Sequence, residues 1–448
     1  MKRKKDMYIN YERSTRNRGR KKANWLLITL TVVLAIGLAG IAIFIVKDYI
    51  LANQQVSFAE VKMDTNSAPR SEPSPEPTAA PTITPTPSPT PSPTPTPTPI
   101  PSPVPTEVPE ITDNRSAVKV KGIYVTASTA GSDRMVSLRE MTAATEINAM
   151  VIDVKDDTGK ITYAMDSPIA QDIDAVTNTV RNMEELISSL KEDKVYTIAR
   201  IVAFKDPYLA KMRPELAIRN QDGTVYKDNN GDSWVNPYNE KVWEYLVEVA
   251  KMAAETGFDE IQFDYIRFST GTGIEQADFG KAAKDKTKEE IITEFTQYAY
   301  EHLKPLGVFV SADVYGTIIN SKIDAARVGQ NYVDMAKYLD YICPMIYPSH
   351  FGEGNYGVKY PDLEPQEIIR KSLLASKEKL DAIPEGEHRA IVRPWLQDFT
   401  ASWIKHYQKY GKKQIREQIN GVYDAGYEEW ILWNAGCNYT EEGLLAEQ

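Results

Sequence analysis

Cysteine and histidine are both scarce in this sequence. Its 448 residues include two cysteines, Cys343 and Cys437, which cannot form a disulfide framework, although a single bridge between them stays open. The four histidines are scattered along the chain: His302, His350, His388 and His406. Their spacing resembles no zinc or di-metal site, so we expect no metal and no cofactor. A metal-dependent deacetylase is disfavoured for the same reason, since its His and Asp ligands are missing.

Positive charge is also scarce beyond residue 24, where acidic residues outnumber Lys and Arg. Residues 1–24 hold ten Lys and Arg against two acidic residues, a charge of +8. The whole chain carries −10, so residues 25–448 carry −18. Nucleic-acid-binding domains are typically basic, so this balance argues against nucleic acid as a partner. The basic tail itself is explained by membrane topology and by anionic lipid.

One long apolar run follows the basic tail. Residues 25–46, "WLLITLTVVLAIGLAGIAIFIV", contain no charge. As a helix they would span about 33 Å, enough for a bilayer core of about 30 Å. A cleaved signal peptide is the main alternative, but its apolar region is usually only about 7–15 residues long. We therefore predict an uncleaved signal-anchor helix, with residues 1–24 cytoplasmic and the rest of the chain outside the cytoplasm.

A proline-rich segment separates this run from the rest of the chain. Residues 69–109 hold 17 of the 28 prolines, alternating with Thr and Ser. Such a composition cannot build a hydrophobic core, and Pro-rich chain extends by about 3.1 Å per residue. These 41 residues could therefore reach about 130 Å. We predict that residues 47–115 form a disordered linker that holds a domain of residues 116–448 away from the membrane.

The remaining sequence alternates between strand and helix patterns. Eight apolar, β-branched runs predict strands at 118–127, 147–156, 194–204, 258–268, 307–316, 339–349, 389–399 and 429–436. Helical patterns lie between most of them, at 137–146, 181–193, 239–256, 287–304, 365–381 and 411–425. Eight such repeats predict a closed (β/α)8 TIM barrel of the α/β class. An open doubly wound sheet would require a glycine-rich phosphate turn after an early strand, and none is present.

Polar residues gather at the carboxyl ends of these predicted strands, which form the active-site face of such a barrel. Because side chains alternate along a strand, Ile261 and Phe263 in "GFDEIQFDYIRFS" should face the helices. Gln262 and Asp264 should face the barrel interior. The other candidate site residues near strand ends are Asp153, Lys155, Arg200, Trp234, Arg267, Asp313, Tyr315, Tyr347, His350, Arg393, Trp395, Asp398, Trp433 and Asn434.

Two interpretations of these ionisable groups are open. They could form buried ion pairs, Asp153–Lys155–Arg200 or Asp264–Arg267, that only satisfy one another. Pairing alone does not explain why the charges sit at one end of the strands, and burying charge is costly. Catalytic barrels concentrate ionisable groups there because carboxylates with perturbed pKa values perform acid–base chemistry. A catalytic cleft is therefore the better interpretation of the whole set.

Tryptophan is the second signal at these strand ends. Trp234, Trp395 and Trp433 all fall in strand-end segments. A single tryptophan is more often part of a core than of a binding site. Aromatic faces that flank carboxylates nevertheless suit sugar rings, whose C–H faces stack on them. The three tryptophans therefore favour a carbohydrate substrate.

Five motifs carry a family resemblance: "FDEIQFDYIRF", "SADVYG", "CPMIYPSHF", "RPWLQDF" and "WVNPYNEKVWEY". Together they resemble a bacterial family of glycoside hydrolase TIM-barrel domains, distantly similar to the α-amylase-like barrels, over about residues 116–440. In similar barrels a carboxylate after strand four is the nucleophile, which implies this role for Asp264. The acid/base often follows strand five, which implies Asp313, where the α-amylase pattern has Glu. The histidine partners of α-amylases are absent.

The spacing of strands indicates which carboxylates could act together. Neighbouring strands are about 4.8 Å apart, so Asp264 and Asp313 could lie about 5–6 Å apart, close to the separation found in retaining glycosidases. Asp153 and Asp264 skip one strand and would be about 9–10 Å apart, near the inverting range. We prefer the first pair and keep Asp153 or Asp398 as the reserve acid.

These inferences combine into one predicted function. We expect a membrane-anchored glycoside hydrolase that acts outside the cytoplasm on a cell-wall or extracellular polysaccharide. Arg200, Lys155 and Arg393 would hold carboxylates ionised or bind substrate oxygens. The alternative is a non-catalytic, glycan-binding or wall-organising barrel, because a fold does not entail an activity. A binding protein needs aromatic platforms but not two opposed acids across one site.

Overall fold

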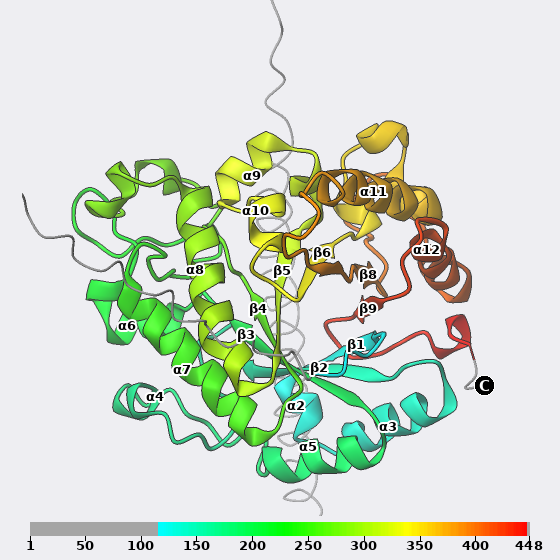
Figure 1. The fold of residues 1–448 in the computed structure, drawn as a ribbon, viewed down its shortest axis with the longest axis horizontal. Coiled ribbons are helices and arrows are strands. Elements are labelled where there is room, and N and C mark those ends of the chain that lie inside the picture. The colour runs from blue at the N-terminus through cyan, green and yellow to red at the C-terminus, as the bar shows by residue number, and fades with distance from the viewer. Residues whose placement is uncertain (1–114, 446–448) are drawn as a thin grey trace, which may run out of the picture. The chain divides into compact units, whose positions relative to one another are not determined.

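The computed structural model describes residues 115–445 (Figure 1). The predicted cytoplasmic tail (1–24), signal-anchor helix (25–46) and nearly all of the predicted linker (47–115) lie outside these residues and stay predictions. Within residues 115–445, no helix combines the length and apolar character needed to cross a lipid bilayer. Cys343 and Cys437 are both buried and both free, so they form no bridge with each other.

The described residues contain nine parallel strands in one closed sheet. They are β1 (Lys121–Val125), β2 (Ala149–Lys155), β3 (Tyr196–Val202), β4 (Glu260–Asp264), β5 (Phe309–Tyr315), β6 (Tyr341–Met345), β7 (Ile391–Val392), β8 (Trp395–Gln397) and β9 (Trp430–Trp433). Neighbours follow the order β5-β4-β3-β2-β1-β9-β8-β6-β7, and β5 also pairs with β6. That last pairing closes the ring and confirms the predicted barrel.

The seventh predicted strand, 389–399, is divided into β7 and β8. Pro394 lies between them, and proline has no backbone N–H to donate to a strand ladder. Both pieces pair with β6: Tyr341 lies opposite Ile391, and Met345 lies opposite Trp395. They therefore occupy one position in the ring, so the barrel has eight strand positions although nine strands are assigned.

Helices follow the strands and surround the barrel in Figure 1. The long ones are α3 (Arg134–Ala144), α5 (Met183–Glu192), α7 (Glu240–Thr256), α8 (Lys288–Leu303), α11 (Pro365–Leu380) and α12 (Lys412–Asp424). The short ones are α2 (Ala127–Ala130), α4 (Pro168–Asp172), α6 (Pro207–Met212), α9 (Lys322–Val328) and α10 (Tyr332–Ala336). All six predicted helices are confirmed within a few residues. Their ends follow local chemistry: Thr287 and Glu290 form a capping box at α8, and Gly257 ends α7 with a φ of 106°.

The apolar residues divide into two layers, one inside the barrel and one between strands and helices. Val151 belongs to the interior cluster, whereas Met150 and Ile152 belong to the larger core beneath the helices. Every residue of β2 and β3 is buried, as expected for parallel strands that are covered on both faces. The predicted alternation is thus confirmed, and it directs Asp153 and Arg200 toward the interior.

Candidate active site

Asp264 is the last residue of β4 and faces an arginine on the neighbouring strand. Arg200 of β3 donates to Asp264 Oδ2 from Nε at 3.0 Å and from Nη2 at 2.6 Å. The strand register explains the contact, because Val202 pairs with Asp264 and Arg200 lies two residues earlier on the same side. The Asp264 side chain remains 13% exposed, so it is partly open to solvent. A charge-assisted contact of this kind fixes the position of the carboxylate.

The backbone around Asp264 is strained. Tyr265 follows it with a φ of +50°, a region that residues with a Cβ rarely adopt. The Tyr265 N–H donates to Asp264 Oδ1 at 2.6 Å. Arg200 and the Tyr265 backbone thus hold the two carboxylate oxygens from different sides. Strain of this kind is found mainly where function requires one geometry.

Asp313 lies on β5, the strand next to β4, in a drier environment. The Trp395 indole Nε1–H donates to Asp313 Oδ1 at 2.5 Å. Burial raises the pKa of Asp313 well above its ordinary value, and the negative charge of Asp264 raises it further. The Trp395 hydrogen bond and the charge of Arg200 only partly oppose this increase. Asp313 is therefore held in its acid form to higher pH than an ordinary aspartate.

Asp153 lies beside this pair but is occupied by other groups. Its Oδ1 accepts from Arg200 Nη1 at 2.8 Å, and its Oδ2 accepts from the Tyr124 hydroxyl at 2.7 Å. Burial raises the pKa of Asp153, and Arg200 opposes that effect. The contact between Asp153 and Arg200 is part of the buried ion-pair group that the sequence offered as an alternative to a catalytic role. Asp153 therefore orients the guanidinium that Asp264 contacts.

Lys155 does not reach this cluster, contrary to the sequence-based expectation. Its ammonium contacts Asp206 at 2.8 Å and donates to the Val202 carbonyl at 2.7 Å, and both charged side chains are fully buried. The reason is a register shift between Asp153 and Lys155, which pairs Lys155 with Ile201, a residue of the core beneath the helices. The bulge turns Lys155 away from the barrel interior.

Arg393 lies at the other end of the barrel. It is fully buried and contacts Glu260 from Nη1 at 2.8 Å and Glu429 from Nε at 2.9 Å. Glu260 begins β4, and Glu429 precedes β9 and accepts from the Val120 N–H just before β1. These are amino ends of strands. Because both of its partners lie at the amino ends, Arg393 does not bind substrate beside Asp264, which lies at the carboxyl end of β4.

Arg393 should instead stabilise the fold. We expect Arg393→Ala to lower the free energy of unfolding by about 3–5 kcal/mol, because two buried carboxylates lose their counter-charge. The matched control is Arg389→Ala, which removes an exposed pair with Asp381 at 2.8 Å and should cost less than about 1 kcal/mol. Thermal unfolding of the full chain, followed by tryptophan fluorescence, measures both. Equal losses in the two variants would contradict this assignment.

Aromatic rings from four strand ends or exits meet beside the carboxylates. We call Tyr124, Tyr347, Phe399 and Trp433 the aromatic cluster. Trp433 stacks on Tyr124 with ring centroids 6.4 Å apart and planes inclined by 14°. It also contacts Tyr347 at 6.0 Å and Phe399 at 5.4 Å. His350 packs against Tyr347, and burial lowers its pKa to about 4, so the imidazole is neutral at pH 7. The cluster gives the site an aromatic wall.

Arg267 belongs to a second aromatic group. Its guanidinium lies over the rings of Trp234 at 4.9 Å, Tyr265 at 5.0 Å and Tyr315 at 4.8 Å. Trp234 is buried and its indole N–H donates to Asp228 at 2.9 Å. Trp234 therefore has no free face for a sugar, and Arg267 supports Tyr265 through cation–π contacts rather than pairing with Asp264 as one alternative expected.

Three further candidates have structural partners. Gln262 lies in the barrel interior, and its Nε2 lies 3.4 Å from Cys343 Sγ. Asp398, the reserve acid, accepts from the N–H and the hydroxyl of Thr440, both at 2.8 Å. Asn434 donates to the Asp398 carbonyl at 2.6 Å. Burial raises the pKa of Asp398, but its contacts join it to the C-terminal segment rather than to Asp264.

Some residues of this site were not predicted from the sequence. Tyr124 and Phe399 of the aromatic cluster, Tyr265, and Asp157 are the main ones. The Asp157 side chain is 42% exposed and lies 3.4 Å from Arg200. Its position two residues after β2 was a usable signal, and so was the interior-facing parity of Tyr124 in β1. The strain at Tyr265 had no sequence signal, since it is a tyrosine and not a glycine.

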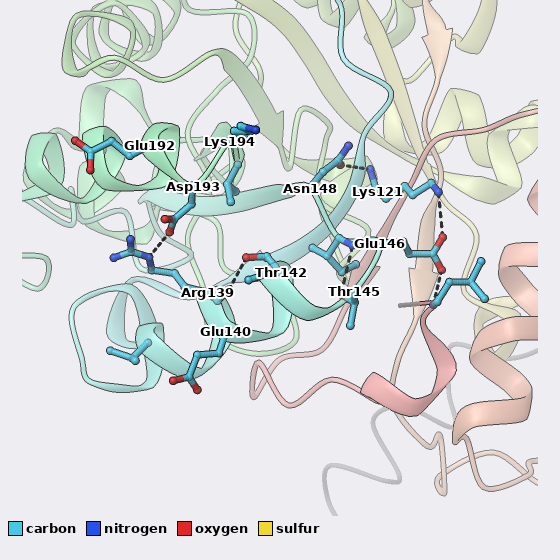
Figure 2. Close-up of a pocket in the computed structure, with 15 residues that line it drawn as sticks. Lys121, Arg139, Glu140, Thr142, Thr145, Glu146, Asn148, Glu192, Asp193 and Lys194 are labelled. Atoms are coloured by element: carbon cyan, nitrogen blue, oxygen red, sulfur yellow. Dashed lines mark hydrogen bonds and ion pairs between the residues drawn. The ribbon is translucent and has the colours of Figure 1, made fainter. Parts of the chain in front are cut away.

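A cavity of about 870 Å³ lies away from these groups. Figure 2 shows its polar wall, in which Lys121 contacts Glu146 at 3.0 Å and Arg139 contacts Asp193 at 2.6 Å. Lys121 begins β1 and Asn148 precedes β2, so the cavity opens at the amino ends of the strands. In TIM barrels the chemistry occurs at the opposite, carboxyl ends. We therefore place the active site at Asp264 and not in this cavity.

The groups at the carboxyl ends can serve acid–base chemistry without a metal ligand set. Within the part of the chain that the structure describes, no group of three or more His, Cys, Asp or Glu side chains is placed to hold a metal ion. What is present is one carboxylate fixed by a guanidinium, one carboxyl group with a raised pKa, and an aromatic wall. Two carboxyl groups whose environments differ in this way are typical of an acid and a nucleophile or base.

This chain is similar to several solved structures and matches one family model. A hypothetical protein from Ruminiclostridium thermocellum is 41% identical over 43% of this chain and 97% of its own, with a TM-score of 0.40. The PgaB (BpsB) glycoside hydrolase domain from Bordetella bronchiseptica is 12% identical over 71% of this chain and 94% of its own, with a TM-score of 0.47. The spore cortex-lytic enzyme SleL from Bacillus megaterium is 12% identical over 73% of this chain and 74% of its own, with a TM-score of 0.43. No curated protein matches the sequence. Residues 122–439 match the family described as "Putative glycosyl hydrolase domain", and because this match spans well over half of the chain, the protein belongs to that family.

Proposed function

We propose that this protein is a membrane-anchored glycoside hydrolase that cleaves a cell-wall or extracellular polysaccharide outside the cytoplasm. The main observation behind the proposed activity is a pair of carboxyl groups on neighbouring strands that have different environments. Asp264 is held by Arg200 at 2.6 Å, whereas Asp313 is buried and its pKa is raised. Glycoside hydrolysis needs one group that is charged and one that carries a proton.

The strand register supports a retaining mechanism. Phe263 of β4 pairs with Ala312 of β5, so Asp264 and Asp313 are the next residues of the two neighbouring strands and share one side. Paired strands are about 4.8 Å apart, which agrees with the separation of about 5–5.5 Å in retaining enzymes. Asp153 is a poorer acid, because both of its oxygens already accept hydrogen bonds from Arg200 and Tyr124.

The chemical steps follow from these environments. Asp313 gives its proton to the glycosidic oxygen while Asp264 attacks the anomeric carbon, which breaks the glycosidic bond and forms a covalent glycosyl-enzyme. Asp313, now a carboxylate, takes a proton from water, and the resulting hydroxide displaces Asp264 from the sugar. Arg200 keeps Asp264 in position through both steps, and Asp153 and Tyr124 orient Arg200. Phe399 and Trp433, the two half-buried rings of the aromatic cluster, supply surfaces on which a sugar ring can stack.

A non-catalytic glycan-binding barrel is the second candidate. The aromatic cluster favours it, because stacking surfaces alone are sufficient for binding. It does not account for a buried carboxyl group with a raised pKa next to an arginine-bound carboxylate, an arrangement that costs stability. The hydrolase therefore explains more of the site.

Incubation of the full-length protein in detergent with a panel of polysaccharides tests the activity. The panel comprises peptidoglycan, chitin, an α-1,4-glucan and a galactan, and new reducing ends are counted. The hydrolase proposal expects release from at least one polymer and none from an Asp264→Ala, Asp313→Ala double variant. Binding to a polymer without cleavage by the unaltered protein would favour the glycan-binding barrel.

The proposed location gives a separate prediction. If residues 1–24 are cytoplasmic and residues 25–46 form the anchor, protease added to intact cells should cut the proline-rich linker. It should release a fragment the size of residues 116–448, because a compact barrel resists proteolysis better than an unstructured segment. Immunoblotting of the medium and of the cell pellet measures the result. Full protection of the domain, while other surface proteins are cleaved, would contradict this orientation.

A further inference from the structure

An exposed tryptophan lies beside the aromatic cluster. Trp403 belongs to the loop between β8 and α12, and it is 60% exposed, more than any other Phe, Tyr or Trp among the described residues. Its ring stacks on Phe399, with centroids 5.9 Å apart and planes inclined by 13°. One of its faces is thus packed, and much of the rest of the ring is open to solvent. An exposed residue of this size leaves a large apolar area in water.

A continuous series of contacts connects Trp403 with the proposed catalytic carboxylates. Phe399 contacts Trp433 at 5.4 Å, and Trp433 stacks on Tyr124. The Tyr124 hydroxyl donates to Asp153, which contacts Arg200 and through it Asp264. Trp403 therefore contacts the aromatic cluster directly, through Phe399. It thus adds a solvent-exposed ring to the aromatic cluster.

The loop that carries Trp403 is held in place. Ala401 is fully buried, and the Tyr410 N–H donates to Thr400 Oγ1 at 3.0 Å. Gln408 donates to Asp362 from its backbone at 3.1 Å and from its side chain to the Asp362 carbonyl at 2.7 Å.

The loop that follows β6, which contains Asp362, makes further contacts with the loop that carries Trp403. His406 packs on Tyr360, with ring centroids 4.1 Å apart, and lies 3.4 Å from Glu353. Two active-site loops therefore support each other. Rigid aromatic surfaces bind with a smaller loss of conformational entropy than mobile ones, so the arrangement suits recognition.

We propose that Trp403, supported by Phe399, is an outer subsite that stacks a sugar ring of a polysaccharide chain whose cleaved bond lies at Asp264 and Asp313. This inference rests on the proposed function and adds to it that the substrate is an extended chain and not a single small glycoside. A small glycoside would occupy the space beside the carboxylates. Only a chain long enough to pass Phe399 would reach Trp403.

The experiment compares four variants of the full-length protein. Trp403→Ala removes the ring, Trp403→Leu keeps apolar bulk without an aromatic face, and Trp403→Phe restores an aromatic face. Val136→Ala is the control, because Val136 is also exposed, at 57%, but lies on α3 and lines the cavity at the amino ends of the strands. Each is made in the Asp264→Ala background, so that binding is read without turnover. The probes are insoluble peptidoglycan, chitin and starch, and protein depletion from solution gives Kd.

The expected result is that the parent binds at least one polymer and that Trp403→Ala and Trp403→Leu weaken this binding by about five- to tenfold, which lies within the range for one aromatic pair. Trp403→Phe and Val136→Ala should stay within about twofold. Unchanged binding in Trp403→Ala, or no binding of the parent to any of the three polymers, would overturn the subsite.

Kinetics separate this inference from the proposed function. In the Asp264-containing protein, Trp403→Ala should lower kcat/KM on the polymer and leave kcat/KM on a nitrophenyl monosaccharide of the same sugar unchanged. Equal loss on both substrates would show that Trp403 acts on the catalytic centre and would overturn the outer subsite. Polymer binding that depends on Trp403 without any cleavage would keep the subsite and refute the hydrolase.

Discussion

Replacing Asp264 with alanine is expected to lower turnover by about a thousandfold or more while the barrel stays folded. The loss follows because the covalent step has no nucleophile, and removal of one member of a catalytic pair is close to a complete loss. The fold should persist, because Arg200 keeps its contacts with Asp153 at 2.8 Å and Asp157 at 3.4 Å. Initial rates on the polymer identified in the panel measure the effect, and the melting temperature reports folding.

Asp157→Asn is the matched control for this prediction. Asp157 contacts the same guanidinium but lies at the rim, where its side chain is 42% exposed. Its removal should change turnover far less, because contacts between exposed charges contribute little. The anomeric configuration of the first product, followed by NMR, tests the retaining step itself. An inverted first product, or full activity in a folded Asp264→Ala protein, would refute Asp264 as the nucleophile.

The second large effect is expected for Asp313→Ala, and it should depend on the leaving group. Polymer hydrolysis should fall by about 10²–10⁴-fold, the usual contribution of a general acid. Aryl glycosides with good leaving groups, such as dinitrophenyl glycosides, need little protonation and should lose much less. Comparison of kcat/KM on the two substrate types measures the difference. A uniform loss on both would indicate that Asp313 supports the fold or binds the sugar instead of donating a proton.

The pH dependence gives the same residue a second readout. Burial raises the pKa of Asp313, so its acid form, which is the active one, disappears only as pH rises through this raised value. The basic limb of kcat/KM should therefore lie well above the ordinary range of aspartate and vanish in Asp313→Asn. Trp395→Phe removes a hydrogen bond that lowers the pKa, so it should move the limb to still higher pH. A limb that stays in place in both variants would assign it to another group.

The raised pKa of Asp313 should also make the stability of the fold decrease as pH rises. A carboxyl group whose folded pKa is raised binds its proton more tightly in the folded state than in the unfolded state. Its contribution is fully present below the unfolded pKa and is lost as pH rises through the folded pKa of Asp313. Asp313→Asn, which is neutral at all pH values, should therefore unfold at a temperature that falls less with rising pH over this window. Melting curves at several pH values measure the difference.

The barrel could be predicted from sequence because its signal is repeated and local. Strands that are buried on both faces appear as continuous apolar runs, and β2 and β3 are of this kind. Side-chain alternation then directed Asp264 and Asp313 toward the interior at the carboxyl ends. This worked because the period of two is a property of any extended chain. Each of these residues lies in an unbroken strand.

Lys155 and Arg393 show where that reasoning failed. Lys155 follows a bulge that pairs it with Ile201, and a shift of one position moves a side chain to the opposite face. Arg393 lies next to Pro394, where the predicted strand is divided in two, and its depth depends on how both pieces pair with β6. Neither the bulge nor the depth is encoded in the alternation of one strand, because both depend on the neighbouring strands.

By itself, the sequence determined the eight-fold repeat, the inward direction of Asp264 and Asp313, and their place at one end of the barrel. Only the tertiary structure decided which groups surround each carboxyl. Arg200 is shared between Asp153 and Asp264, and the Trp395 indole is directed at Asp313. It also brought Trp403 from a loop without periodicity to the edge of the aromatic cluster. The physical reason is that the pKa of a carboxyl depends on burial and on charges brought near it by other strands, whereas the direction of its side chain is set locally.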